Sequence, residues 1–139
     1  YIMPNGNPVF DIRNNSVIET ATNRLIAGAI LSSKIHESVT TIGKEAFYES
    51  CIASVDLHAG ITTIEDYAFD YSDITQIICR ATTPPTLGES PFRLTNYSGR
   101  MKVPEESISL YRSSWFLTDV GYLGWTNYRW GLVALAEGE

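Results

Sequence analysis

Residues 35–56, IHESVTTIGKEAFYESCIASVD, and residues 57–78, LHAGITTIEDYAFDYSDITQII, carry one pattern twice. Seven apolar positions of the first segment have an apolar counterpart at the same place in the second, without a slip. The first set is Ile35, Val39, Ile42, Ala46, Phe47, Ile52 and Val55, and the second is Leu57, Ile61, Ile64, Ala68, Phe69, Ile74 and Ile77. A fixed period of about 20 to 50 residues is typical of stacked repeat proteins. The sequence therefore predicts coils that lie on one another and share one interior.

Strand-like alternation recurs at the repeat boundary, in residues 54–58 and 76–80. Apolar residues two apart predict strands with one buried face, and stacked copies of such strands form a parallel sheet. We expect four side chains to point inward, namely Val55, Leu57, Ile77 and Cys79. Their neighbours Asp56, His58, Ile78 and Arg80 then point outward. The same position can be followed along the whole chain, which predicts five rungs, at Met3, Ile35, Leu57, Cys79 and Val103.

The chain on either side of the regular repeats predicts an enlarged first coil and a closing cap. In residues 5–34, two short apolar runs, 16–20 and 24–27, flank a three-residue turn and predict a β-hairpin. The period breaks at Thr82, because Pro84 and Pro85 lack the backbone donor of a central strand. We expect an irregular loop to Arg100, a strand at residues 101–103 and a capping helix from about Glu105. The buried stripe of that helix is predicted as Ile108, Tyr111, Trp115 and Phe116.

Several of these segments resemble the BspA-like leucine-rich repeat proteins of bacterial surfaces and secretions. The resemblance lies in residues 6–11, 13–15, 18–23 and 25–28, in the Val-Thr-Thr-Ile and Ile-Thr-Thr-Ile runs with their Ala-Phe pairs, and in the Pro-Pro, Val-Pro, Tyr and Trp order of the cap. It covers residues 1–120 and implies an α/β repeat solenoid, a β-rich right-handed coil with an N-terminal hairpin insert and a C-terminal capping helix. The family usually has proline where His36 and His58 stand. Residues 121–139 extend past the usual cap, and we expect an additional hairpin that turns at Thr126 and Asn127.

Composition limits the function classes. The chain has 139 residues and a net charge of −6, with Lys and Arg scattered rather than clustered, so we expect no nucleic-acid partner. No apolar run is long enough to span a membrane, and no signal peptide is visible. Because the chain opens on a strand-phase Tyr, we interpret it as part of a longer chain or as a mature product. Cys51 and Cys79 fall in different parts of the coil, so we expect two buried free thiols rather than a disulfide.

The candidate interaction site is the exposed strand face of the most regular rungs, formed by Lys34, His36, Asp56, His58, Ile78 and Arg80. Two His on neighbouring rungs can share a metal ion, with Asp56 or Glu37 as a third ligand, but the nearby Lys34 and Arg80 disfavour a cation. A solvated polar face is the competing interpretation, and we expect neither metal nor cofactor.

Catalysis is not predicted, because no nucleophile elbow, phosphate-binding glycine loop or dinucleotide motif is present. The resemblance implies a non-catalytic module at the cell surface or outside the cell, with an adhesion-type protein ligand such as host matrix or another surface protein. Two alternatives stay open. One is a structural cap or spacer of a longer surface protein. The other is a carbohydrate-binding accessory domain that uses Trp125, Tyr128 and Trp130, although such aromatics also suit the core of a cap.

Overall fold

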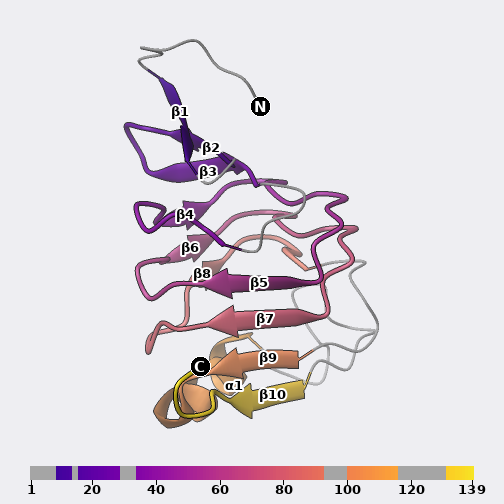
Figure 1. The fold of residues 1–139 in the computed structure, drawn as a ribbon. Helices are drawn as coiled ribbons and strands as arrows, with labels where there is room; N and C mark the ends of the chain where they lie inside the picture. The colour runs from indigo at the N-terminus through magenta and orange to yellow at the C-terminus, as the bar shows by residue number, and fades with distance from the viewer. Residues whose placement is uncertain (1–8, 14–15, 29–33, 93–99, 116–130) are drawn as a thin grey trace.

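The computed structural model describes residues 9–13, 16–28, 34–92, 100–115 and 131–139. In these ranges the chain is rich in strands, has one short α-helix and forms two sheets (Figure 1). The first sheet has the order β1-β2-β3-β4-β6-β8, with bounds Phe10–Arg13, Ser16–Glu19, Arg24–Ala27, Thr41–Ile42, Thr63–Ile64 and Thr86–Leu87. The second sheet has the order β10-β9-β7-β5, with bounds Gly131–Ala134, Arg100–Val103, Gln76–Cys79 and Ser54–Leu57.

The two regular repeats stack in parallel register, which confirms the predicted period. In the first sheet Thr41 pairs with Thr63, and in the second sheet Val55 pairs with Ile77. Backbone hydrogen bonds connect the same repeats outside the strands, as from the Thr62 N–H to the carbonyl of Thr40 at 2.9 Å. The strands of the second sheet lie one beside the next in Figure 1, from β5 to β10. The right-handed sense of the coil stays a prediction.

The core lies between the two ladders and contains every apolar position of the repeat pattern. All of these side chains are buried, and the most exposed of them, Ile35, has a relative exposure of 7%. At the centre, Phe47 stacks on Phe69 and Phe69 on Phe92, with nearly parallel rings 5.0 and 5.3 Å apart. A small residue precedes each of the first two rings, Ala46 and Ala68, and both are buried. The core is thus continuous from coil to coil, as parallel sheets with a buried face require.

The N-terminal part of the first sheet is antiparallel. β2 pairs with β3 around the turn at residues 20–23, with Glu19 opposite Arg24. β3 then pairs in parallel with β4, which connects this part to the first regular repeat. The strand β1, antiparallel to β2, was not predicted. The predicted first rung at Met3 lies outside the described residues, and the parallel bridge between Lys34 and Asp56 marks the next rung.

The prediction that the period ends at Thr82 is wrong. The strand β8 pairs in parallel with β6, Thr63 opposite Thr86, so one more rung follows within the predicted irregular loop. The Phe69 N–H donates to the Pro91 carbonyl at 2.7 Å, as the Phe47 N–H does to Ala68. The two prolines directly precede β8 and therefore remove no donor from the ladder.

The cap consists of β9, a 3₁₀ turn at Glu105–Ser107 and the helix α1 at Ile108–Trp115, close to the predicted start. Tyr111 and Trp115 are fully buried, Ile108 packs against the core, and Phe116 lies outside the described residues. Side-chain donors of the cap bond three backbone carbonyls of the preceding segment: Ser107 Oγ to Thr82 at 2.8 Å, Tyr111 Oη to Ala81 at 2.8 Å and Trp115 Nε1 to Pro85 at 3.0 Å. These bonds give the three main-chain acceptors side-chain donors from the cap.

The last strand adds a rung that was not predicted. β10 runs parallel to β9, with Leu132 opposite Met101. Residues 121–130, which include the predicted hairpin turn, lie outside the described residues, so the hairpin stays a prediction.

Candidate functional site

We define the outer face as the outward side of the second sheet, together with Lys34 and His36 beside β5. Burial alternates along β5 and β7, so that Asp56 and Ile78 are half-buried between fully buried neighbours. The structure brings the predicted site residues together here. The backbone of Lys34 forms a parallel β-bridge with Asp56, and Asp56 lies opposite Ile78 in the sheet. An open depression of about 400 Å³ is lined by Lys34, Ile35, Asp56, His58 and Arg80.

An ion pair connects two rungs across this face. Arg80 Nε donates to Asp56 Oδ1 at 2.8 Å, and Arg80 Nη2 donates to Asp56 Oδ2 at 2.9 Å. Such a bidentate pair fixes the orientation of the guanidinium as well as its position. The hydrogen bonds to Asp56 raise the pKa of Arg80 above its usual value. Asp56 is therefore engaged by a cation and is not placed as a metal ligand.

The two histidines have backbone partners. Nδ1 of His36 accepts the Ser38 N–H at 3.1 Å, and Nδ1 of His58 accepts the Gly60 N–H at 3.1 Å. His58 Nε2 lies 3.1 Å from the carbonyl oxygen of His36, which can only accept, so the neutral ring carries its proton on Nε2. Both nitrogens of His58 are thus used, one in the local turn and one between rungs. These hydrogen bonds give His58 a structural function, in which neither ring nitrogen is placed to share a metal ion.

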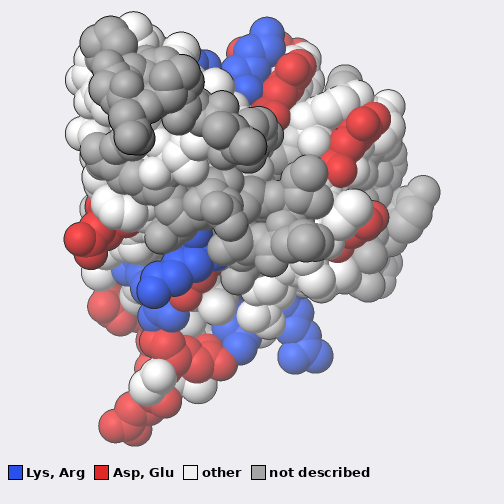
Figure 2. Space-filling view, turned by 45° about the horizontal axis from the view of Figure 1, so that its top comes forward, with Lys and Arg blue, Asp and Glu red and all other residues white. Residues whose placement is uncertain are grey.

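The outer face is cationic although the chain is acidic. Its described charged residues are Asp56 and four cations, Lys34, Arg80, Arg100 and Lys102. On the side of the molecule that Figure 2 presents, side chains of both signs are interspersed. Sequence analysis did not include Arg100 and Lys102 in the site. The signal was present, because the predicted rung at Val103 puts both residues in phase with Gln76 and Ile78, their partners in β7.

The C-terminal residues fold back onto this face. Lys102 Nζ lies 2.5 Å from Oε1 of Glu139, and Arg80 Nη1 donates to the main-chain oxygen of Glu139 at 2.5 Å. Oε2 of Glu139 accepts the Ala136 N–H at 3.0 Å. The hydrogen bonds from Lys102 and Ala136 hold the pKa of the Glu139 carboxyl below its usual value. Nothing in the sequence pattern predicts these contacts.

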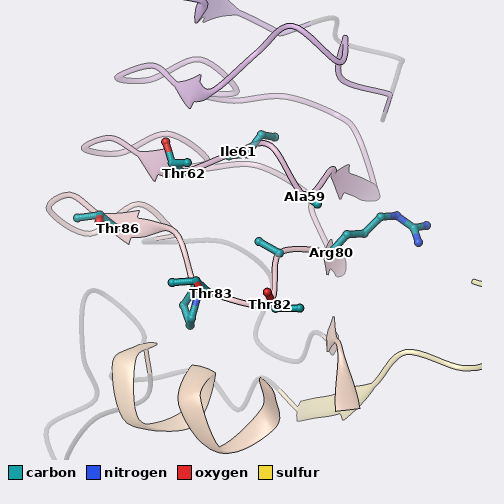
Figure 3. Close-up of a pocket in the computed structure, with 9 residues that line it drawn as sticks. Ala59, Ile61, Thr62, Arg80, Thr82, Thr83 and Thr86 are labelled. Atoms are coloured by element: carbon teal, nitrogen blue, oxygen red, sulfur yellow. The ribbon is translucent and has the colours of Figure 1, made fainter. Parts of the chain in front are cut away.

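A second depression, of about 450 Å³, lies beside the outer face and was not predicted (Figure 3). The Arg80 side chain extends away from it in Figure 3, so its walls are neutral. They are formed by four threonines and by small or apolar residues: Thr62, Thr82, Thr83, Thr86, Ala59, Ile61, Ala81 and Pro84, with Arg80 at the rim. No titratable group of this depression is placed for acid–base chemistry within the described residues.

Exposed aromatic rings occur in the turns. Tyr48 and Tyr71 meet edge to face, with ring centroids 5.6 Å apart, and are 44% and 49% exposed. The aromatics expected to bind carbohydrate, Trp125, Tyr128 and Trp130, lie outside the described residues.

The prediction of two buried free thiols is correct in part. Both cysteines are free and Cys79 is buried, but Cys51 is exposed. Cys51 precedes Ile52, whose side chain takes the interior position, so the chain direction turns the thiol outward. Burial raises the pKa of the Cys79 thiol far above its usual range.

Among the described residues, no group of three or more His, Cys, Asp or Glu side chains is placed to hold a metal ion. No helix in the described ranges has the length and apolar character needed to cross a membrane.

Comparison with known proteins gives a family and no individual relative. No curated protein and no solved structure matches the chain. The family model described as "BspA type Leucine rich repeat region (6 copies)" matches residues 27–120, about two thirds of the chain. This range contains both regular repeats, the additional rung at β8 and the closing helix. The stacked repeats and this match together show that the chain belongs to the BspA-type leucine-rich repeat family.

Proposed function

We propose that this chain is a non-catalytic, adhesion-type protein-interaction module of a cell-surface or secreted protein, and that it binds its partner through the outer face. Leucine-rich repeats commonly bind proteins, and members of this family are typically found at the surface or secreted. The expected partners are host matrix proteins or other surface proteins.

The observation that carries the proposal is the concentration of cations on one face of an acidic chain. Within the described residues, the outer face combines four cations with one carboxylate of its own, Asp56, and the Glu139 carboxylate lies against Lys102. The face also has a depression of about 400 Å³. Electrostatic complementarity of this kind steers a partner and sets specificity. A repeat scaffold also lets outward residues vary while the buried pattern stays unchanged.

The proposal is tested with purified matrix proteins immobilised on a sensor surface. We compare the wild type with Lys34→Glu, which reverses one exposed charge of the outer face. The matched control is Lys44→Glu, which makes the same change at an exposed residue outside the second sheet. Both variants are first shown to fold by circular dichroism.

Loss of binding in Lys34→Glu alone supports the outer face. Equal binding by the wild type, Lys34→Glu and Lys44→Glu would show that the binding site lies outside the outer face. Absence of binding to any matrix or surface protein would favour the structural spacer. Binding to a glycan array that is lost in Trp125→Ala, with Lys34→Glu unaffected, would favour the carbohydrate-binding alternative.

A further inference from the structure

Two exposed tyrosines meet in the turns that connect the two sheets. Tyr48 lies between β4 and β5, and Tyr71 lies between β6 and β7, on the next coil. The backbone brings these turns together, because the Glu49 N–H donates to the Asp70 carbonyl at 3.1 Å. The two rings meet edge to face with their centroids 5.6 Å apart, and about half of each side chain is exposed. The pair therefore forms one aromatic surface that spans two coils.

The fold does not require either aromatic ring. In the 22-residue repeat the counterpart of Tyr48 is Asp70 and the counterpart of Tyr71 is Glu49, so the repeat pattern specifies no tyrosine at these positions. Tyr71 also has a φ of 56°, in the left-handed region that bulky residues rarely adopt. Neither core packing nor backbone preference explains this side chain, and such outliers occur preferentially where a side chain has a function.

Free carboxylates flank the aromatic pair. Glu45 and Glu49 are exposed, and within the described part of the chain neither carboxylate forms a hydrogen bond or an ion pair. Lys44, which directly precedes Glu45, pairs with neither of them. Desolvation and, after it, the negative charge of Glu49 raise the pKa of Tyr48 above its usual value, and every charged neighbour that contributes is an acid. The surroundings of the two rings are therefore negative.

We define the turn surface as Tyr48, Tyr71, Glu45 and Glu49. An arginine side chain complements this combination, because its guanidinium stacks on an aromatic ring and donates to a carboxylate. We propose that the turn surface is a second interaction site, and that it binds an arginine-rich segment of a partner protein. The turn surface lies between the two sheets, in segments that contribute nothing to the outer face. The proposal is therefore independent of the proposed function.

The probe is a fluorescein-labelled hexa-arginine peptide, and the readout is fluorescence anisotropy at low and at physiological salt. The wild type is expected to bind, with an affinity that falls as salt rises. Glu49→Gln is expected to weaken binding about twofold to fivefold, whereas Glu106→Gln, the same change at an exposed carboxylate of the cap, should have a smaller effect.

Two further variants test the rings, and circular dichroism first confirms that all variants fold. Tyr71→Asn removes one ring and places a residue that tolerates a positive φ at this position, so the turn is preserved. Tyr48→Leu keeps apolar bulk and removes the other π-system. Each is expected to weaken binding about twofold to fivefold. The control is Leu110→Asn, which alters a similarly exposed apolar side chain on α1 and is expected to bind like the wild type.

Equal weakening by Glu49→Gln and Glu106→Gln would show that net charge alone attracts the peptide, and it would overturn the site. Unchanged binding in both tyrosine variants, or no binding by the wild type at low salt, would overturn it as well. None of these results would affect the proposed function, because matrix binding and its dependence on Lys34 are measured without this peptide. Conversely, peptide binding that depends on the turn surface, with no matrix binding, would support this site while refuting the adhesion-type partners.

Discussion

Phe47 and Phe69, which hold the same position in consecutive repeats, stack face to face with their ring planes 5° from parallel. Phe69 also stacks on Phe92, so its ring is covered on both sides and is fully buried. We call these three stacked rings, Phe47, Phe69 and Phe92, the aromatic column. Each coil adds one ring to it, as each coil adds one strand to a backbone ladder. The stability of each coil therefore depends on its neighbours.

Phe69→Ala is expected to lower the free energy of unfolding by about 3–5 kcal/mol, because it removes a buried ring and leaves a cavity between two others. Urea denaturation followed by circular dichroism measures the change. Tyr48→Ala, at a ring that is 44% exposed, is the control and should cost less than about 1 kcal/mol. Similar losses in the two variants would argue against the central column.

His58 has two separable hydrogen bonds, and two substitutions divide them. In His58→Asn the shorter side chain can still accept the Gly60 N–H, as an Asx turn does, but cannot reach the His36 carbonyl. We expect a loss of about 0.5–1.5 kcal/mol from the bond between rungs, and a larger loss for His58→Ala, which removes both. Denaturation of the two variants under identical conditions tests this order, and equal stabilities would contradict it.

Tyr111→Phe tests the side-chain donors of the cap. The substitution keeps the buried ring and removes the hydroxyl that donates to the Ala81 carbonyl. Because that carbonyl belongs to a buried residue, losing its donor should cost about 1–3 kcal/mol. The matched control is Ser113→Ala, an exposed hydroxyl of the same helix, which is expected to be close to neutral.

The two thiols should differ in reactivity. Alkylation requires the thiolate, and Cys79 is both inaccessible and shifted to a higher pKa by burial. Mass spectrometry after iodoacetamide treatment at mildly alkaline pH should show one modification, at the exposed Cys51, in the native protein and two in urea. Equal reaction of both cysteines in the native state would show that the interior of β7 is open to solvent.

The attachment of the C-terminal turn should depend on pH. Its contacts lower the pKa of Glu139, so the charged carboxylate favours the attached state, and this preference is complete above the usual carboxyl pKa. As pH falls through the lowered pKa, protonation removes the pairing with Lys102, while lysine and arginine side chains stay charged throughout. The amide resonance of Ala136, which donates to this carboxylate, should shift with the same midpoint. A midpoint at the ordinary carboxyl value would contradict the contact.

The repeat in the sequence was sufficient to predict the stacked core. Positions such as Val55 and Ile77 recur at a constant spacing, and burial of one strand face depends only on such local alternation. The additional rung was missed because the prolines before Thr86 and a slightly longer spacing obscured it. Comparison of Phe69 with Phe92, the next ring of the column, would have revealed it.

The site was predicted less completely for a related reason. The outward positions of β5 and β7 follow from alternation, so the residues of the candidate face were found together. The contacts of Glu139 with Arg80 and Lys102 join segments 59 and 37 residues apart without a repeat between them. No local pattern encodes such contacts, since they depend on where the chain returns after β10. The same is true of the donors from the capping helix, which a helical stripe predicts as buried but not as hydrogen-bonded.

The cap, through its 3₁₀ turn and its helix, bonds the coil beneath it at the main-chain oxygens of Ala81, Thr82 and Pro85. A peptide carbonyl is present in every residue, so these three hydrogen bonds do not depend on the identity of the side chains in the unit that they close. Whole units can then be duplicated or deleted upstream without redesigning the terminus. The length of the array, and with it the width of its cationic surface, is free to vary by simple gene duplication.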